Sequence, residues 1–384
     1  MFNLKREGLT DLSQLKSINH ILERDSKDTT YKFALLRSVI DAVQYYDHLK
    51  KEEKDTVTFP LGVLIEKWIL YYYPLIESNI PQKHGENNTK GRTLAFKKYF
   101  DTICNYYRDK GGFNFFYNEY KKGIFHEDIK KDFLKLLKSL KNTITNMPMK
   151  YLGNSYFKKY YSVFKYNHDS KITEIPETLD VEYIVRNFGT FSFSKELYVV
   201  FKYLGSFMNG TESIIYKWAE FSANADKNKF LTVEKVLDKL LITPETERDV
   251  LTSKVFFEKL LHEKNELECI WSGKKIAKNF LNIDHILPFS IWKNNDLWNL
   301  LPVHKAVNSD KKDKIPSPDL IEMRKNIIHY YWELLSNQYV ERFQKEIYYD
   351  LVGNDEKISP IESLKNKANY LINIRGYEEW NSTK

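Results

Sequence analysis

The sequence predicts an α+β protein in which helices predominate, and three observations lead to this fold class. Hydrophobic residues make up 42% of the 384 residues, while Gly and Pro are scarce at 14 and 11, so an ordinary globular fold is favoured over a disordered or fibrous one. Apolar residues recur at helical spacing along most of the chain. Residues 268–318 differ, because short strand-like runs, prolines and turns gather there.

Amphipathic helices are predicted in order along the N-terminal two thirds of the chain. The stretch FALLRSVIDAVQYY is typical, because its apolar side chains keep helical spacing. The least helical part is 150–190, where YYSVFKYN indicates a strand. The predicted helices span 11–24, 30–50, 60–78, 93–108, 126–145, 193–207, 211–225 and 246–265, and helix returns from Ile321 onward.

The chain is predicted to form two domains. A mostly helical accessory region is expected over 1–250, and a second domain over 251–384 contains the strand-rich island, although any boundary between 240 and 255 is compatible with the pattern. Within the first region, the turn-rich stretch IPQKHGENNTKGR is long enough to suggest a function, such as tracking along a bound strand.

Positive charge is unevenly distributed. The formal net charge is +7, but residues 83–165 carry 18 Lys and Arg against 7 Asp and Glu, a surplus of 11. Clustered positive charge is expected of a protein that binds a polyphosphate, and Lys97 and Lys98 are candidate contacts within this segment. A set of helices coated with solvated lysines would give the same count.

Neither a secretory signal nor a membrane span is expected. The N-terminus has no apolar run behind its charges, and the longest apolar stretch, residues 61–76, is too short for a bilayer and contains Glu66 and Lys67. The sequence therefore predicts a soluble, cytoplasmic protein. Cys104 and Cys269 cannot make a disulfide framework, and without a CxxC pair any metal must be held by oxygen and nitrogen ligands.

Chemistry-bearing residues concentrate in the island at 268–318. Asp284 and His285 stand at the end of a strand-like run, NIDHILP, a dipeptide that by itself is usually an ordinary polar step. Asn299 follows His285 by 14 residues, and Asn308 follows it by 23, in a segment that reads as a short helix. Several positions in order are much more informative than the dipeptide alone.

Together these residues resemble an HNH endonuclease, of the ββα-metal (His-Me finger) class. The specific likeness is to the HNH domain of RNA-guided CRISPR effector nucleases and related restriction-type HNH proteins. It rests on DHILP, the two offsets, NSDKKDKIP and the upstream CIWSGKKI, and covers about 50 of the 384 residues. The implied fold is two antiparallel strands and a helix around one divalent metal.

The resemblance implies a role for each residue. His285 would be the general base, since an imidazole is suited to take a proton from water near neutral pH. Asp284, on the opposite face of the strand, and Asn308 would supply hard oxygen ligands for Mg²⁺ or Mn²⁺. Asn299 would pin the connection between the strands, or support the imidazole as part of the catalytic site.

Lysines and histidines around the motif leave alternatives open. Lys305, Lys311 and Lys312 are candidate phosphate contacts. His304 could face the metal or simply be a polar residue at the start of the helix. Ser272 stands where many HNH proteins have the second cysteine of a zinc-binding pair, so no structural zinc is expected.

The sequence thus predicts a metal-dependent HNH endonuclease that hydrolyses DNA, in bacterial restriction or anti-phage defence. A homing-type mobile-element nuclease is the alternative within the enzyme class. A nucleic-acid-binding subunit of a defence complex, without catalysis, is the alternative outside it. Because one HNH site cuts one strand per event, a homodimer or a defence-complex partner is also considered.

Overall fold

The computed structural model describes residues 28–84, 93–123, 125–152, 163–167, 175–208, 214–244, 248–264, 266–353 and 358–381. The chain divides into two compact units, Met1–Glu245 (unit 1) and Thr246–Lys384 (unit 2), and each is described by itself. The helix expected at 11–24 lies outside the described residues, as do residues 85–92 of the expected loop.

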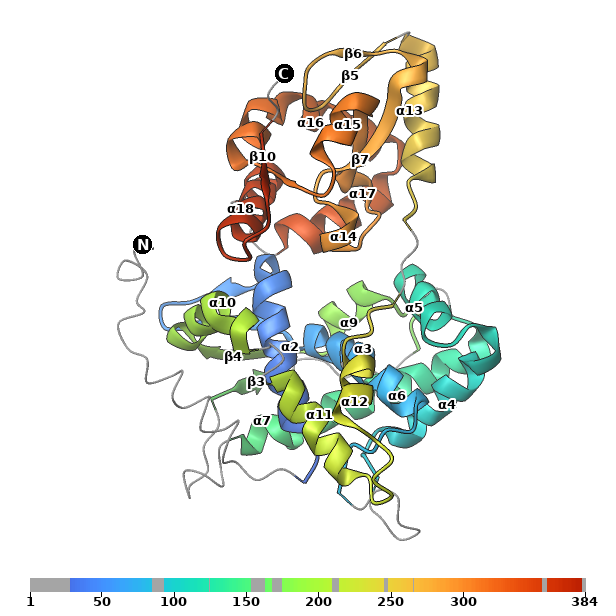
Figure 1. Cartoon of the computed structure of the whole chain (residues 1–384), viewed down its shortest axis with the longest axis vertical. Helices are drawn as coiled ribbons and strands as arrows, with labels where there is room; N and C mark the ends of the chain where they lie inside the picture. Colours follow the sequence, from blue (N-terminus) through green and yellow to red (C-terminus); the bar gives the residue numbers. More distant parts are fainter. Residues whose placement is uncertain are drawn as a thin grey trace. The chain divides into compact units, whose positions relative to one another are not determined.

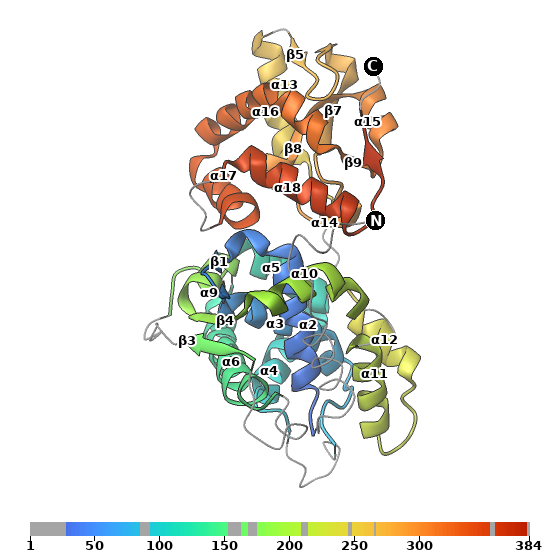
Figure 2. The same ribbon diagram turned by 90° about the vertical axis from the view of Figure 1, so that its left-hand side faces the viewer.

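Unit 1 is mostly helical, as Figures 1 and 2 show. Its helices are α2 (Tyr31–Tyr45), α3 (Leu61–Glu77), α4 (Lys97–Tyr107), α5 (Gly112–Lys122), α6 (Glu127–Asn146), α7 (Pro148–Tyr151), α9 (Val181–Asn187), α10 (Lys195–Met208), α11 (Ile214–Ala225) and α12 (Val233–Leu240). The sequence analysis did not predict α5, α7, α9 or α12. In α5 the signal was present, because Phe113, Phe116 and Tyr120 recur at helical spacing and all three are buried.

Helix α3 is the centre of unit 1 and contacts α2, α4, α6, α9 and α12. It is apolar on nearly every side, which is the pattern of a helix enclosed by others. Trp68, Tyr72 and Tyr73 are fully buried within it. At Gly62 a Cβ would lie 2.2 Å from the carbonyl oxygen of Ile184, so the close approach of α9 to α3 requires glycine.

A small antiparallel sheet completes unit 1. Its strands are β1 (Lys51–Glu52), β2 (Thr56–Pro60), β3 (Lys165–Asn167) and β4 (Thr190–Ser194), in the order β1-β2-β4-β3. Strand β3 lies in the expected YYSVFKYN segment, whereas β2 and β4 were not predicted. Burial alternates along β4, where Phe191 and Phe193 face the core and stack on Phe59 of β2 with ring centroids 6.0 Å apart.

Unit 2 surrounds a short hairpin with helices. Its helices are α13 (Leu251–Lys264), α14 (Phe289–Trp292), α15 (Lys305–Lys311), α16 (Pro318–Gln338), α17 (Val340–Ile347) and α18 (Pro360–Asn373). Its strands are β5 (Leu267–Glu268), β6 (Lys275–Ile276), β7 (Leu281–His285), β8 (Leu300–His304), β9 (Ile315–Pro316) and β10 (Glu379–Trp380). Ser317 and Ser359 begin α16 and α18 as N-caps, each followed by proline.

Strands β7 and β8 form the antiparallel hairpin, and α15 follows directly and contacts both. The register pairs Asp284 with Leu301 and His285 with Leu300. The hairpin packs into one hydrophobic core with α13, α16 and α18. This is the strand-strand-helix order that the resemblance implied, and the mostly helical α+β class is confirmed.

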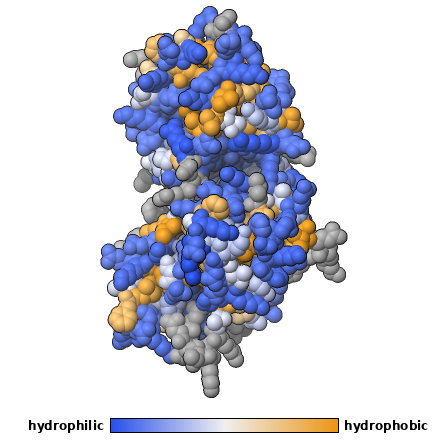
Figure 3. All heavy atoms as spheres, turned by 90° about the vertical axis from the view of Figure 1, so that its right-hand side faces the viewer, coloured by the Kyte–Doolittle hydropathy of each residue, from blue (hydrophilic) through white to orange (hydrophobic). Residues whose placement is uncertain are grey.

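The exposed surface in Figure 3 is largely hydrophilic, with small hydrophobic patches. In the described part of the chain, every helix falls short of the length and apolar character needed to span a membrane.

Candidate active site

Strand β7 carries the two central side chains, Asp284 and His285, and both are buried, at 3% and 2% exposure. Successive residues of a strand point to opposite faces of the sheet. The carboxylate and the imidazole therefore occupy different environments although they are adjacent in sequence.

The Asp284 carboxylate is held by two donors. The indole Nε1 of Trp271 donates to Oδ2 at 2.9 Å, and Lys311 Nζ lies 3.2 Å from Oδ1 and 3.1 Å from Oδ2. Sequence analysis missed Trp271, although it stands inside the CIWSG stretch on which the resemblance partly rests. Charge compensation explains how a carboxylate is accommodated in this buried position.

Lys311 is fully buried, at 0% exposure, and its ammonium also donates to the carbonyl oxygen of His285 at 2.8 Å. Burial lowers the pKa of Lys311, and the attraction of Asp284 acts against that shift. Lys311 was predicted to contact phosphate, and the structure corrects this prediction. A buried ammonium bonded to Asp284 does not face a DNA backbone in this arrangement.

The two ring nitrogens of His285 differ in their contacts. Its Nε2 lies 3.2 Å from Oδ1 of Asn295, while its buried Nδ1 has no hydrogen-bond partner among the described residues. Burial lowers the pKa of His285 to about 4, and the nearby positive charges of Arg248 and Lys311 act in the same direction. The imidazole is therefore neutral at pH 7, with one nitrogen partnered.

Asn299 clamps the chain just beyond β7. Its Oδ1 accepts from the backbone N–H of Leu287 at 2.8 Å, and its Nδ2 donates to the Leu287 carbonyl oxygen at 3.0 Å and to Oδ1 of Asn294 at 3.1 Å. Asn299 is completely buried. Within the described part of the chain it makes no hydrogen bond to His285, so the contact that was considered for Asn299 is made by Asn295.

Helix α15 brings Asn308 to the hairpin. Asn308 is half-buried, and its amide makes no hydrogen bond to the residues described here, while α15 contacts β7. His304 caps this helix, since its Nδ1 accepts from the N–H of Ala306 at 3.2 Å. That bond matches the helix-start alternative for His304 rather than a metal contact.

The residue types of Asp284 and Asn308 suit a hard cation, although the buried ammonium of Lys311 already compensates the charge of Asp284. Asp284 offers carboxylate oxygens and Asn308 an amide oxygen, the ligand types that Mg²⁺ and Mn²⁺ prefer, and Mg²⁺ commonly keeps several waters. Across the described ranges no group of three or more His, Cys, Asp and Glu could hold a metal, so a site here would depend on few protein ligands.

The remaining candidate lysines lie on the surface. Lys305 and Lys312 are exposed beside the hairpin. In unit 1, Lys98 is exposed with its ammonium 4.7 Å from the ring centroid of Tyr99, whereas Lys97 is bonded to Asp101 at 2.7 and 2.8 Å. An existing ion pair makes Lys97 less available for phosphate than Lys98.

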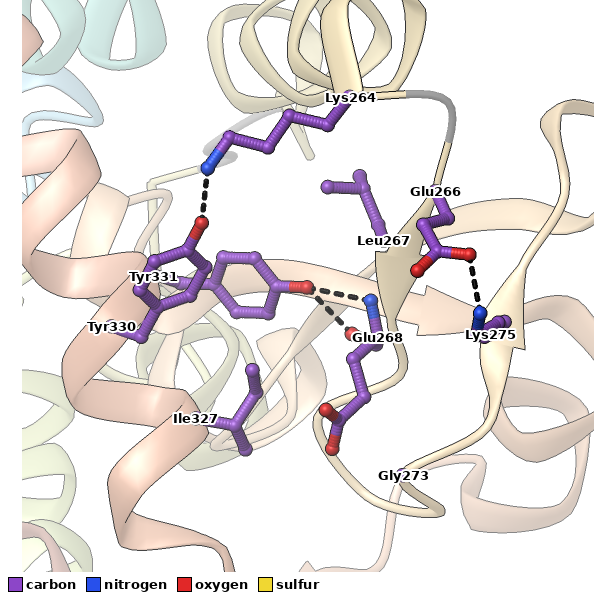
Figure 4. Close-up of a pocket in the computed structure, with 9 residues that line it drawn as sticks. All are labelled: Lys264, Glu266, Leu267, Glu268, Gly273, Lys275, Ile327, Tyr330 and Tyr331. Atoms are coloured by element: carbon purple, nitrogen blue, oxygen red, sulfur yellow. Dashed lines mark hydrogen bonds and ion pairs between the residues drawn. The ribbon is translucent and has the colours of Figure 1, made fainter.

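A pocket of about 270 Å³ in unit 2 is separate from these residues (Figure 4). Its lining consists of Lys264, Glu266, Leu267, Glu268, Gly273, Lys275, Ile327, Tyr330 and Tyr331. Figure 4 shows the hydroxyl of Tyr331 bonded to the backbone of Glu268, while Lys275 pairs with Glu266. Local contacts thus use several of its polar groups, and none of the predicted site residues lines it.

The hairpin, its buried Asp-His pair and the following helix define the class of module. Residues 269–317 match the family model of HNH endonucleases, which confirms the HNH resemblance and indicates a nuclease that acts on nucleic acid with a divalent metal. The chain as a whole belongs to the family described as a domain of unknown function (DUF8808), whose model matches residues 11–240. No curated protein and no solved structure is similar enough to match the chain.

Proposed function

We propose that this protein is a cytoplasmic endonuclease that hydrolyses DNA phosphodiester bonds, with His285 as general base and one Mg²⁺ or Mn²⁺ held by Asp284 and Asn308. The observation that carries the proposal is the environment of His285. It is a neutral, buried imidazole whose Nδ1 has no partner among the residues that the structure describes, and it follows a carboxylate within a segment that matches HNH endonucleases. Such a nitrogen can accept a proton from an attacking water.

The low pKa of His285 fits this role once substrate is considered. A base with a pKa of about 4 is always deprotonated at neutral pH but accepts protons weakly. A bound phosphodiester brings negative charge next to the imidazole and would raise that pKa, while the positive charge of a bound metal would oppose the rise. Substrate would therefore strengthen the base as far as the phosphate charge outweighs that of the metal.

On the other face of the strand, Trp271 and Lys311 hold the Asp284 carboxylate in one orientation. When bound, the divalent metal supplies positive charge that stabilises the transition state and the departing oxygen. Asn299 keeps the chain after β7 in place through both backbone groups of Leu287. Lys305 and Lys312 would contact neighbouring phosphates.

A plasmid assay tests catalysis. Purified protein is incubated with supercoiled plasmid and Mg²⁺ or Mn²⁺, with EDTA, His285→Ala and His262→Ala as controls. His262 is an exposed histidine on α13 and serves as the matched variant. Nicking or linearisation that disappears with EDTA and in His285→Ala, but persists in His262→Ala, supports the proposal. A wild-type protein that binds DNA but is inert with both metals would instead favour a binding subunit.

For DNA engagement, exposed lysines of the basic segment are the leading candidates. Lys98, Lys122 and Lys131 are exposed on α4, α5 and α6. Replacing all three with alanine should weaken DNA binding and flatten its salt dependence. A variant that makes fewer phosphate contacts releases fewer counterions when it binds. Gel-shift titration at several salt concentrations measures both, and an unchanged affinity with an unchanged slope would remove this segment from the interface.

For biological context we favour restriction or anti-phage defence, with a homing-type nuclease as the rival. This choice, like the closer likeness to CRISPR effector HNH domains, rests on family association rather than on physical argument. Cleavage at a short recurring site, or only in the presence of an invader, favours defence, whereas one long site favours homing. Light scattering with and without DNA would reveal a homodimer.

A further inference from the structure

The side-chain oxygen of Asn295 lies between two nitrogen atoms. Its Oδ1 is 3.2 Å from Nε2 of His285 and 3.0 Å from the backbone nitrogen of Asp249. Asn295 follows α14 in the connection from β7 to β8, and Asp249 precedes α13 near the start of unit 2. One amide oxygen therefore links the imidazole to a segment distant from it in sequence.

The Asp249 contact fixes which way the Asn295 amide points. A backbone N–H can only donate, so the atom that faces Asp249 must be the amide oxygen and not the NH₂ group. The same oxygen faces His285 Nε2 and carries no hydrogen. Nε2 must then carry the proton, which leaves the lone pair of the neutral imidazole on Nδ1.

Other polar groups near His285 are engaged elsewhere. The Asp284 carboxylate is held by Trp271 and Lys311, and the Asn299 amide is bonded to Leu287 and Asn294. The loop that carries Asn295 is also held from another element, since Nη2 of Arg342 on α17 donates to the Asn295 carbonyl oxygen at 3.4 Å.

We propose that Asn295 is a positioning residue, which holds His285 in the tautomer with its proton on Nε2 and presents the Nδ1 lone pair to the attacking water. The Asp249 N–H holds Asn295 in turn. The catalytic part of this inference rests on the proposed function, whereas the tautomer does not depend on it.

The tautomer is measured first, on the full metal-free chain with ¹⁵N-labelled histidine. Long-range ¹H–¹⁵N correlation spectra at neutral pH distinguish a protonated from an unprotonated ring nitrogen, and the His285 signals are assigned as those lost in His285→Gln. We expect a protonated Nε2 and an unprotonated Nδ1. Asn295→Ala should give a mixture of tautomers, while Asn295→Asp, which keeps an oxygen acceptor, should keep the proton on Nε2.

The cleavage rate is measured next. With saturating DNA and metal, Asn295→Ala should lower kcat by about 10- to 100-fold with little change in KM, and Asn295→Asp should restore most of the rate. A proton on Nδ1 in the wild type, or an Asn295→Ala spectrum identical to wild type, overturns the proposal even if the enzyme cuts DNA. If the wild type does not cut, the proposed function fails, and the spectra still decide the tautomer.

Discussion

The two faces of strand β7 differ in how completely their polar groups are used. On one face, both oxygens of Asp284 have donors, from Trp271 and from the ammonium of Lys311. On the other face, His285 has one nitrogen against Asn295 and a second nitrogen without a partner among the described residues. The two donors fix the orientation of the Asp284 carboxylate, which keeps further lone pairs for a metal, whereas the free lone pair of His285 can accept a proton. Adjacent residues thus have separate environments because the strand directs them to opposite faces.

The largest stability effect is expected from Lys311. Lys311→Met removes one partner of a buried ion pair and leaves the Asp284 charge uncompensated, which should cost about 3–5 kcal/mol of the free energy of unfolding. Chemical denaturation of the metal-free protein measures it. Lys312→Met is the matched control, because Lys312 is the exposed neighbour. If Lys311→Met loses little stability, burial of Asp284 does not depend on the ammonium. If the loss is large, the double variant Lys311→Met with Asp284→Asn should recover part of it.

The His285 face should show its own dependence on pH. The folded pKa of about 4 lies below the ordinary value of 6.5, so the unfolded chain binds a proton more readily. The stability contributed by neutral His285 is fully present above pH 6.5 and is lost as pH falls toward 4, by up to about 3 kcal/mol. Between pH 7 and pH 4, the free energy of unfolding should therefore fall less in His285→Gln than in wild type. Equal losses in both proteins would contradict the buried neutral imidazole.

Trp271 tests the second donor to Asp284. Trp271→Phe keeps an aromatic ring but removes the N–H that Asp284 accepts, and hydrogen bonds to charged groups are worth about 1.5–3 kcal/mol. For comparison, Trp332 donates to the neutral carbonyl oxygen of Trp298 at 2.8 Å, so Trp332→Phe should cost closer to about 1 kcal/mol. Thermal and chemical denaturation of both variants give the difference. If Trp332→Phe loses as much free energy of unfolding as Trp271→Phe, the charge of Asp284 does not strengthen the hydrogen bond from Trp271.

The smallest effect concerns Arg248. Its positive charge contributes to the low pKa of His285, but Arg248 is exposed and solvent screens it. Arg248→Ala should therefore raise the pKa of His285 only slightly, by an amount that changes the free energy of protonation by less than about 1.4 kcal/mol. An NMR titration of His285 measures it, with Arg248→Lys as the variant that keeps the charge. If the pKa of His285 is unchanged in Arg248→Ala at low salt, the charge of Arg248 does not affect the imidazole.

Much of the HNH module could be predicted from sequence. The order and spacing of Asp284, His285, Asn299 and Asn308 were enough to indicate the module, because a small fold needs its polar groups at fixed places along the chain. Lys311 was predicted to contact phosphate, as were Lys305 and Lys312, and only three-dimensional packing shows that its ammonium lies inside against Asp284. Trp271 and Asn295 were missed for the same reason, since neither residue type indicates a partner that is distant in sequence.

The sequence by itself determined the helical majority and the place of the nuclease module, because hydrophobic periodicity and motif spacing are local properties of the chain. The tertiary structure decided what each polar atom contacts. It gave the Asp284 carboxylate a buried ammonium and an indole N–H, and gave one imidazole nitrogen an amide oxygen that is itself held by Asp249. These partners come from separate elements, and burial strengthens each contact by removing water, so their energies follow from packing rather than from spacing.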